Sequence, residues 1–187
     1  MTQQSIFEPE GRAVPYIEEG EGPIVLVLIS AGSPEKDGLG VVSHYLDEEA
    51  GFRIVRIGER AAGATRDERV ADARDLMDHL GIERTWVGGY GAGGTVARAF
   101  AAAHADRVNG VALLGVEPEE VPLVPLVPVL IIQASDDTVT PRANAEALQA
   151  LAPERVSIKT VDDADHFFPV THPVETAVII EEYLDWD

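Results

Sequence analysis

The chain has 187 residues, of which 45% are hydrophobic and 25% charged, so it has enough apolar side chains to bury a core. Its formal net charge of −19 repels phosphate backbones and anionic lipids, which disfavours nucleic acids and membranes as partners. Cysteine is absent, which excludes disulfides, thiolate metal sites and cysteine nucleophiles. No apolar run approaches the roughly 18 residues of a membrane span, and residues 1–5 lack the basic start of a secretory signal, so we expect a cytoplasmic protein.

Apolar runs alternate with amphipathic stretches along the chain. Two weak strands come first, near residues 5–8 and 14–18. The core strands are predicted at 24–29, 52–57, 85–88, 110–114, 129–133 and 156–160, and the helices at 39–49, 66–80, 93–104, 142–151 and 174–184. Continuous apolar strands that alternate with helices predict a mostly parallel sheet covered on both faces, with an antiparallel hairpin at its entry.

A glycine-rich turn, residues 88–94, follows the strand predicted at 85–88. A strand, a tight turn and a helix in this order serve two chemistries, the binding of phosphate at a helix N-terminus and the nucleophile elbow G-x-S-x-G. Gly89, Gly91 and Gly94 fit the dinucleotide pattern G-x-G-x-x-G. However, the strand before them is not the first, no acidic residue ends the next strand, and the net negative charge opposes phosphate, so the elbow is favoured.

The segments around this turn resemble the α/β-hydrolase family. Residues 80–84 are similar to the family's approach to the elbow, residues 104–108 to its exit, and residues 60–63 to its R-x-x-G turn. The resemblance covers about residues 14–184. It implies the α/β-hydrolase fold, and it places Gly91 where the family carries its nucleophilic serine.

The family usually inserts a cap between the strands predicted here at 110–114 and 129–133. This chain has only residues 117–128 there, and their four prolines forbid a helix and favour an extended tether. We therefore expect a single α/β-hydrolase-like domain over residues 1–187, with about eight mostly parallel strands, helices on both faces and no cap. The site would be shallow and open, and its rim would carry Tyr90, Phe167 and Phe168.

The resemblance also implies a catalytic acid and a catalytic base. Asp137 lies four residues before a proline, which is the family's acid position, and Asp136 is the alternative, better suited to capping the loop. His166 follows the last strand at the family's base position, with Asp165 where glycine is usual. The chain order of elbow, acid and base matches the family. We predict that Asp137 accepts a hydrogen bond from His166 and orients its ring over Gly91, although each carboxylate taken alone reads as a solvated turn residue.

The oxyanion hole is expected beside the end of the strand at 24–29. There Ile29 or Ser30 replaces the family's His-Gly, and the N–H of Ala92 is the second expected donor. Ser30 and Ser33 are candidates for binding a substrate, and equally for satisfying their own loop. A single histidine among acidic residues does not make a transition-metal site, so neither metal nor cofactor is expected.

Three functions fit these residues. The first is a hydrolase-type enzyme acting on a small ester or carbonyl compound, in which His166 and Asp137 work without a serine at position 91. The second is a non-catalytic ligand-binding or interaction protein, as in the N-myc downstream-regulated family, which this chain resembles at the elbow alone. The third is a serine esterase inactivated by an engineered serine-to-glycine change. The intact acid and base favour the first, and the sequence predicts no oligomeric state.

Overall fold

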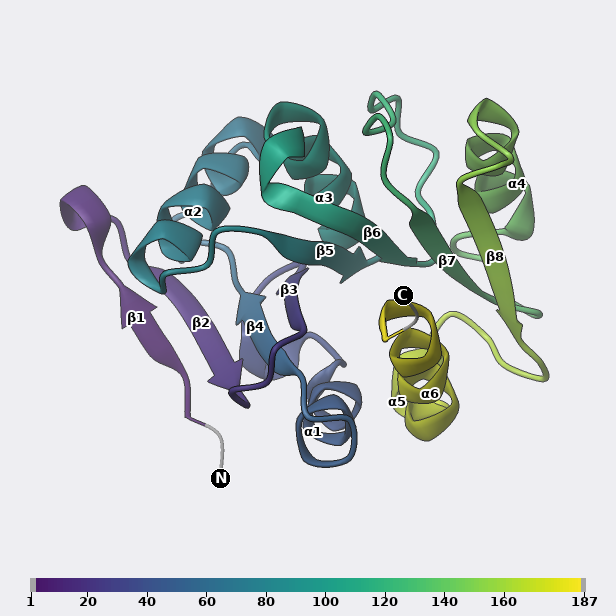
Figure 1. The fold of residues 1–187 in the computed structure, drawn as a ribbon, viewed down its shortest axis with the longest axis horizontal. Helices are drawn as coiled ribbons and strands as arrows, with labels where there is room; N and C mark the ends of the chain where they lie inside the picture. The colour runs from purple at the N-terminus through teal and green to yellow at the C-terminus, as the bar shows by residue number, and fades with distance from the viewer. Residues whose placement is uncertain (1–2, 186–187) are drawn as a thin grey trace.

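The computed structural model describes residues 3–185, and these residues form one eight-stranded sheet with the order β1-β2-β4-β3-β5-β6-β7-β8 (Figure 1). β1 pairs with β2 and β2 with β4 in antiparallel fashion, whereas every pair from β4 to β8 is parallel. The predicted entry hairpin is therefore confirmed. The strands are β1 (Ser5–Phe7), β2 (Val14–Glu19), β3 (Val25–Ile29), β4 (Arg53–Ile57), β5 (Thr85–Tyr90), β6 (Val108–Leu114), β7 (Val129–Ala134) and β8 (Val156–Val161).

Helices cover both faces of the sheet, α2, α3 and α4 on one and α1, α5 and α6 on the other (Figure 1). Three short 3-10 helices lie at Pro9–Gly11, Pro34–Lys36 and Ala105–Arg107. The α-helices are α1 (Gly40–Glu48), α2 (Arg66–His79), α3 (Ala92–Ala103), α4 (Arg142–Leu151), α5 (Phe168–Thr171) and α6 (Pro173–Leu184). The four-residue α5 was not predicted, because one turn is too short to display a helical period.

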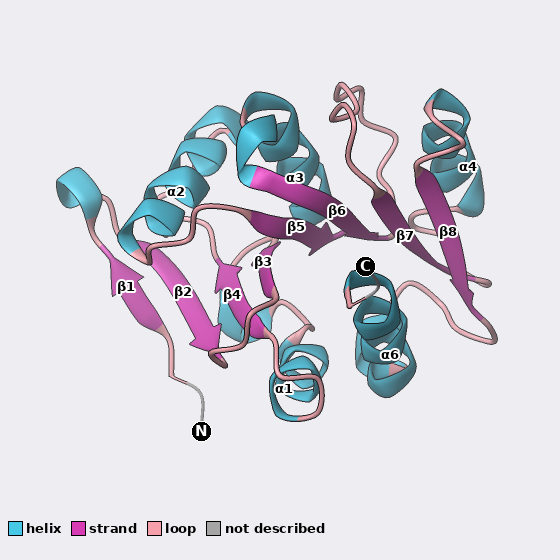
Figure 2. Ribbon diagram, in the orientation of Figure 1, coloured by secondary structure: helices cyan, strands magenta, loops and turns pink. Residues whose placement is uncertain are grey.

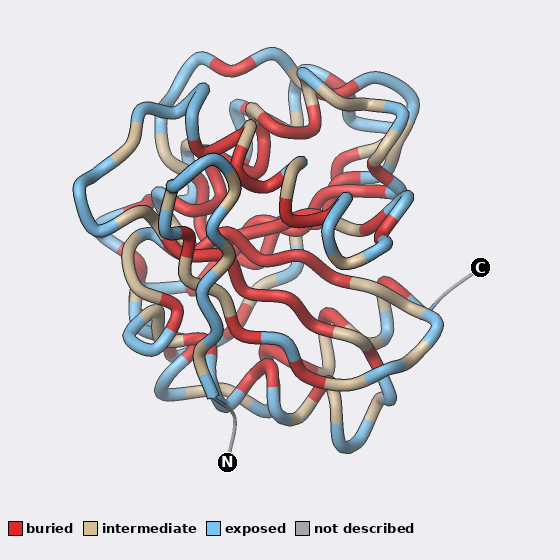
Figure 3. Tube along the Cα trace, turned by 90° about the vertical axis from the view of Figure 1, so that its left-hand side faces the viewer, coloured by how far each residue is buried: buried red, intermediate tan, exposed pale blue. Residues whose placement is uncertain are grey.

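The central strands are buried. In Figure 3 the segments that cross the middle of the molecule are coloured red, the colour of buried residues. Val27 and Ile29 of β3 belong to the hydrophobic cluster under α2, α3 and α4, while Leu26 and Leu28 belong to the cluster under α1 and α6. Alternate side chains therefore face opposite layers, which explains the unbroken apolar runs of the sequence. The predicted fold class is confirmed.

The segment between β6 and β7, residues 115–128, contains neither helix nor strand (Figure 2). Val121 and Val124 are buried, and Val124 belongs to the hydrophobic cluster under α2, α3 and α4, whereas Leu126 is 91% exposed. The proline-rich tether therefore forms no helix and adds no cap over the sheet, as predicted, although it bends at residues 125–127, where Leu126 has a φ of 65°. None of the helices within residues 3–185 is long and apolar enough to cross a membrane.

Ion pairs and a capping box fix α2 against the sheet. Thr65 caps the helix by accepting a hydrogen bond from the N–H of Glu68, whose carboxylate accepts one from the N–H of Thr65. Arg60 donates two hydrogen bonds to Asp72, at 2.7 and 2.8 Å, and Arg12 donates a third at 2.7 Å. These contacts tie the helix to the loops before β2 and after β4, which lie at the same edge of the sheet because the two strands are antiparallel.

Candidate active site

Gly91 occupies the sharp turn between β5 and α3, with φ of 55° and ψ of −118°. L side chains rarely adopt this region, whereas glycine adopts it without strain. A Cβ built at Gly91 meets only Cε1 and Nε2 of His166, each at 4.0 Å. A side chain at position 91 would thus point at the imidazole, and backbone strain is its main cost.

The first turn of α3 lies very close to the end of β3. A Cβ built at Gly93 would stand 1.9 Å from the carbonyl oxygen of Ile29, and one built at Gly89 would stand 2.3 Å from the carbonyl carbon of Gly93. Only glycine fits either place. This close approach brings the loop after β3 next to the turn at Gly91, so that two backbone segments face the same space.

Asp137 and His166 meet beside this turn. The Nδ1 atom of His166 lies 3.0 Å from Oδ2 of Asp137, whose side chain is fully buried. The Oδ1 atom accepts hydrogen bonds from the N–H groups of Val139 and Thr140, and Oδ2 accepts one from the hydroxyl of Thr140 at 2.7 Å. Asp136, the alternative acid, is exposed.

Asp137 is ionised despite its burial. Burial alone would raise the pKa of Asp137, but the hydrogen bonds from Thr140 and His166 together hold that pKa below its ordinary value. An ionised carboxylate only accepts hydrogen bonds, so Nδ1 of His166 carries the proton that faces Asp137, and Nε2 is the ring nitrogen on the side of Gly91. Thr140 was not predicted, although a threonine three residues after an aspartate is a common turn signal.

Aromatic rings fix the outer side of the imidazole. Tyr90 stacks on His166 with centroids 5.0 Å apart, and its hydroxyl donates a hydrogen bond to the carbonyl oxygen of His166. Burial raises the pKa of Tyr90 to about 12, and the charges of Asp137 and Asp165 act in the same direction, so the hydroxyl keeps its proton. Phe167 is 61% exposed and packs edge-on against His166 with centroids 5.9 Å apart.

Phe168 does not lie at the rim, and this prediction is wrong. It is fully buried in the cluster under α1 and α6, with Tyr90 packed edge-on against it. The reason is that α5 begins at Phe168 and turns consecutive side chains to different sides. Phe167 faces the solvent and Phe168 faces the core.

The structure does not support the roles predicted for Ile29 and Ser30 in the oxyanion hole. Ile29 lies within β3, paired with β4 and β5, so its backbone belongs to the sheet. Ser30 donates its N–H to the carbonyl oxygen of Ile57 at 2.8 Å and its hydroxyl to Asp37 at 2.7 Å. Ser33 caps the 3-10 helix Pro34–Lys36 by accepting a hydrogen bond from the N–H of Glu35 at 3.4 Å, and its hydroxyl donates one to Oε1 of Gln4 at 3.5 Å.

The next residue, Ala31, presents a free donor instead. Ala31 is exposed, its N–H has no hydrogen-bond partner within residues 3–185, and its nitrogen lies 3.5 Å from the Cβ position of Gly93. Ala92 is the first residue of α3, where N–H groups lack intrahelical acceptors and no side chain caps them. The N–H groups of Ala31 and Ala92 therefore belong to the two backbone segments that meet beside the turn at Gly91. The sequence gives no signal for Ala31, because the group concerned belongs to the backbone.

Comparisons with known proteins identify the fold. The model of the α/β hydrolase fold family matches residues 63–126, about a third of the chain, which includes the turn at Gly91. An α/β-hydrolase enzyme from the metagenome of lagoon sediments at Mar Chica, Morocco, is 18% identical, with a TM-score of 0.82 and 98% of each chain covered. The chain has the α/β-hydrolase fold.

Further solved structures with this fold include an esterase and a carboxylesterase. A thermophilic esterase from Thermogutta terrifontis is 17% identical, with a TM-score of 0.80, and 99% of this chain and 98% of that chain are covered. A carboxylesterase of the thaumarchaeon Nitrososphaera gargenis is 16% identical, with a TM-score of 0.78 and coverages of 97% and 98%. No curated protein has a significant sequence match to the chain.

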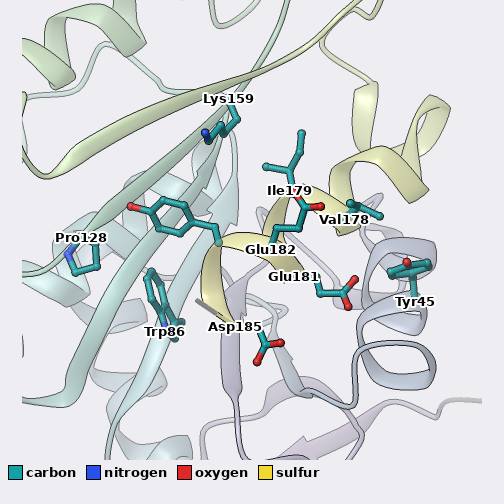
Figure 4. Close-up of a pocket in the computed structure, with 10 residues that line it drawn as sticks. Tyr45, Trp86, Pro128, Lys159, Val178, Ile179, Glu181, Glu182 and Asp185 are labelled. Atoms are coloured by element: carbon teal, nitrogen blue, oxygen red, sulfur yellow. The ribbon is translucent and has the colours of Figure 1, made fainter. Parts of the chain in front are cut away.

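The dyad does not line the cavity beneath α6. A cavity of about 1050 Å³ lies beneath α6, at the amino-terminal ends of β5 and β7 (Figure 4). Trp86, Pro128, Lys159 and Tyr45 line it, and none of the lining residues belongs to the turn at Gly91 or to the dyad. The open, shallow site expected over Gly91 from the missing cap stays a prediction.

Acid is expected to remove a contribution of Asp137 to stability. The pKa of Asp137 is lower in the folded protein than its ordinary value, so the ionised form stabilises the fold above the ordinary pKa of about 3.9. This contribution is lost as the pH falls through the folded value. Urea unfolding between pH 7 and pH 3 should show Asp137→Asn losing stability relative to wild type at pH 7, with the difference shrinking below about pH 4. Asp136→Asn, at the exposed neighbour, is the control and should keep the wild-type pH dependence; a pH-independent deficit in Asp137→Asn would contradict the prediction.

Proposed function

We propose that this protein is a hydrolase that cleaves a small ester or related carbonyl compound by general-base activation of water. The observation that carries the proposal is the position of His166, whose Nε2 lies 4.0 Å from the Cβ position of Gly91 while Nδ1 is held by Asp137. In serine hydrolases the nucleophile stands at the place of Gly91, and here the imidazole faces that space directly. The similarity to esterases in the solved structures supports the choice of an ester.

The reaction follows from the donors and acceptors around Gly91. Nε2 of His166 takes a proton from a water molecule, and the water oxygen bonds to the carbonyl carbon of the substrate. The carbonyl oxygen becomes an oxyanion that accepts hydrogen bonds from the N–H groups of Ala92 and Ala31. The intermediate then breaks its bond to the alkoxide, which takes the proton back from Nε2, so that a carboxylic acid and an alcohol leave. Asp137 stabilises the imidazolium that exists between the two proton transfers.

The rate of such an enzyme is limited because it has neither a nucleophilic side chain at position 91 nor a cap over the site. General acid–base catalysis by one side chain contributes about 10²–10⁴-fold, and the open rim lets water weaken the electrostatic interactions. Slow turnover of small, activated substrates is therefore expected. The exposed apolar side chains around the dyad, Phe167 and Val139, favour an uncharged acyl or aromatic group on the substrate.

His166→Ala is expected to lower the hydrolysis of nitrophenyl esters and lactones by about 10²–10⁴-fold, because the base is removed. His44→Ala is the matched control, because His44 is exposed on α1 and its Nδ1 faces the carboxylate of Glu19, at 3.9 Å, instead of Asp137. Turnover that survives unchanged in His166→Ala would overturn the proposal. A ligand that binds intact in calorimetry, with no turnover by the wild type, would instead support the non-catalytic function.

A further inference from the structure

The peptide group between Ser30 and Ala31 is held by an unusual partner. The carbonyl oxygen of Ser30 accepts a hydrogen bond of 2.5 Å from Nη2 of Arg69, which comes from α2. The hydroxyl of Ser30 is anchored on Asp37 and its N–H on Ile57. Every polar group of Ser30 is thus fixed, and the remaining group of the same peptide plane is the free N–H of Ala31.

Fixing the carbonyl also fixes the direction of this N–H. The structure contains no cis peptide bond among its described residues, and in a trans peptide the C=O and N–H bonds point in opposite directions. The N–H of Ala31 therefore points away from Arg69. In the sheet, Ile29 of β3 is paired with Gly89 of β5, so Ala31 and Gly91 each lie two residues beyond one paired position.

Burying the guanidinium group of Arg69 carries a desolvation penalty. It is only 8% exposed, and burial lowers its pKa, which the charges of Glu59 and Asp72 partly oppose. Burying an unpaired cation destabilises the fold by several kcal/mol. An apolar side chain could fill the same space without this penalty, so packing alone does not explain an arginine here. A cation on the carbonyl oxygen draws electron density from the amide nitrogen, and a charge-assisted hydrogen bond is about twice as strong as a neutral one. The partner N–H thereby becomes a stronger donor.

We propose that Arg69 is a positioning residue of the oxyanion hole, which clamps the carbonyl of Ser30 and thereby aims and polarises the N–H of Ala31. The inference rests on the proposed function, because a polarised N–H beside Gly91 matters only when a negative oxygen forms there. It adds a component that acts from α2, the helix fixed by Arg60 and Asp72, and so gives the ion pairs of that helix a connection to the site.

The first test reads the amide itself and needs no turnover. In ¹⁵N-labelled protein, Arg69→Met should move the amide proton of Ala31 upfield, because the cation no longer polarises its peptide. Arg69→Lys keeps the charge but not the planar guanidinium, and its Ala31 resonance should lie between those of Arg69→Met and wild type. Arg74→Met, at an exposed position of the same helix, is the control and should leave Ala31 unchanged. An unchanged Ala31 resonance in folded Arg69→Met or Arg69→Lys would overturn the proposal.

The second test separates positioning from structure. Removing one donor of an oxyanion hole costs about 10²–10³-fold in kcat, so Arg69→Met, which weakens a donor without deleting it, should lower kcat by about 10-fold or more with KM unchanged. Methylguanidinium added to Arg69→Ala should restore part of kcat, which a merely structural role does not predict. If wild type shows no turnover while Ala31 still responds to Arg69→Met, the proposed function fails and the clamp stands. If His166→Ala abolishes turnover while Arg69→Met changes neither kcat nor the Ala31 shift, the clamp fails and the proposed function stands.

Discussion

Gly91→Ser is expected to turn this protein into a serine esterase that forms a covalent acyl-enzyme. The Cβ of the new serine would stand 4.0 Å from Nε2 of His166, so a staggered rotamer brings its hydroxyl within hydrogen-bonding reach of the base. Loss of the nucleophilic serine costs a serine protease about 10⁶-fold in kcat, and restoring it here should raise esterase activity by about 10³-fold or more. The gain is smaller than the full factor because no cap excludes water from the site.

The measurement is the hydrolysis of nitrophenyl acetate, followed for a burst of nitrophenol and, by mass spectrometry, for an acetylated protein. Gly91→Ala is the matched control, because it adopts the same positive φ of 55° without bringing a hydroxyl. Both variants should lose about 1–3 kcal/mol of stability, since a side chain in this backbone region is strained. A folded Gly91→Ser that shows neither a burst nor an acyl adduct would mean that the dyad does not act on position 91.

The sequence predicted the sheet and the helices on its two faces, because these elements are encoded by the spacing of apolar residues close together in the chain. Continuous apolar runs such as that of β3 need cover on both faces, and the spacing of Val70, Ala73 and Leu76 marks one face of α2. The turn at Gly91 was located from its glycines and from the resemblance to a family. β5 nevertheless runs to Tyr90, two residues further than predicted, because pairing with Leu113 and Leu114 of β6 overrides the low strand propensity of glycine.

The partners of the site residues were less accessible to sequence reasoning because they come from distant parts of the chain. Ser30 was a candidate for binding a substrate. Its N–H instead donates a hydrogen bond to Ile57, 27 residues away, and its carbonyl oxygen accepts one from Arg69, 39 residues away. Arg69 lies in a strongly charged stretch that gives no sign of its burial. The free N–H of Ala31 is a backbone group, which every residue except proline has, so the residue type does not reveal it. Sequence thus located the loops, and tertiary packing decided which groups in them remain free.

Gly93→Ala is expected to destabilise the protein by about 3 kcal/mol, although alanine is the better helix former. The substitution gains up to about 1 kcal/mol of helix propensity, but its Cβ would lie 1.9 Å from the carbonyl oxygen of Ile29, a backbone atom that cannot rotate away. α3 must then move off the end of β3. That movement separates the N–H groups of Ala92 and Ala31, so hydrolysis should fall together with stability.

Urea unfolding measures the first effect and ester hydrolysis by the folded fraction measures the second. Gly32→Ala is the control within the same site, since a Cβ there meets nothing within 4 Å and its φ is not positive. It should change the free energy of unfolding by less than about 0.5 kcal/mol, in line with surface substitutions generally. If Gly93→Ala proved as stable as Gly32→Ala, the contact between β3 and α3 would be looser than 1.9 Å implies. The two N–H groups would then not be held at a fixed separation, and the oxyanion hole would lose its physical basis.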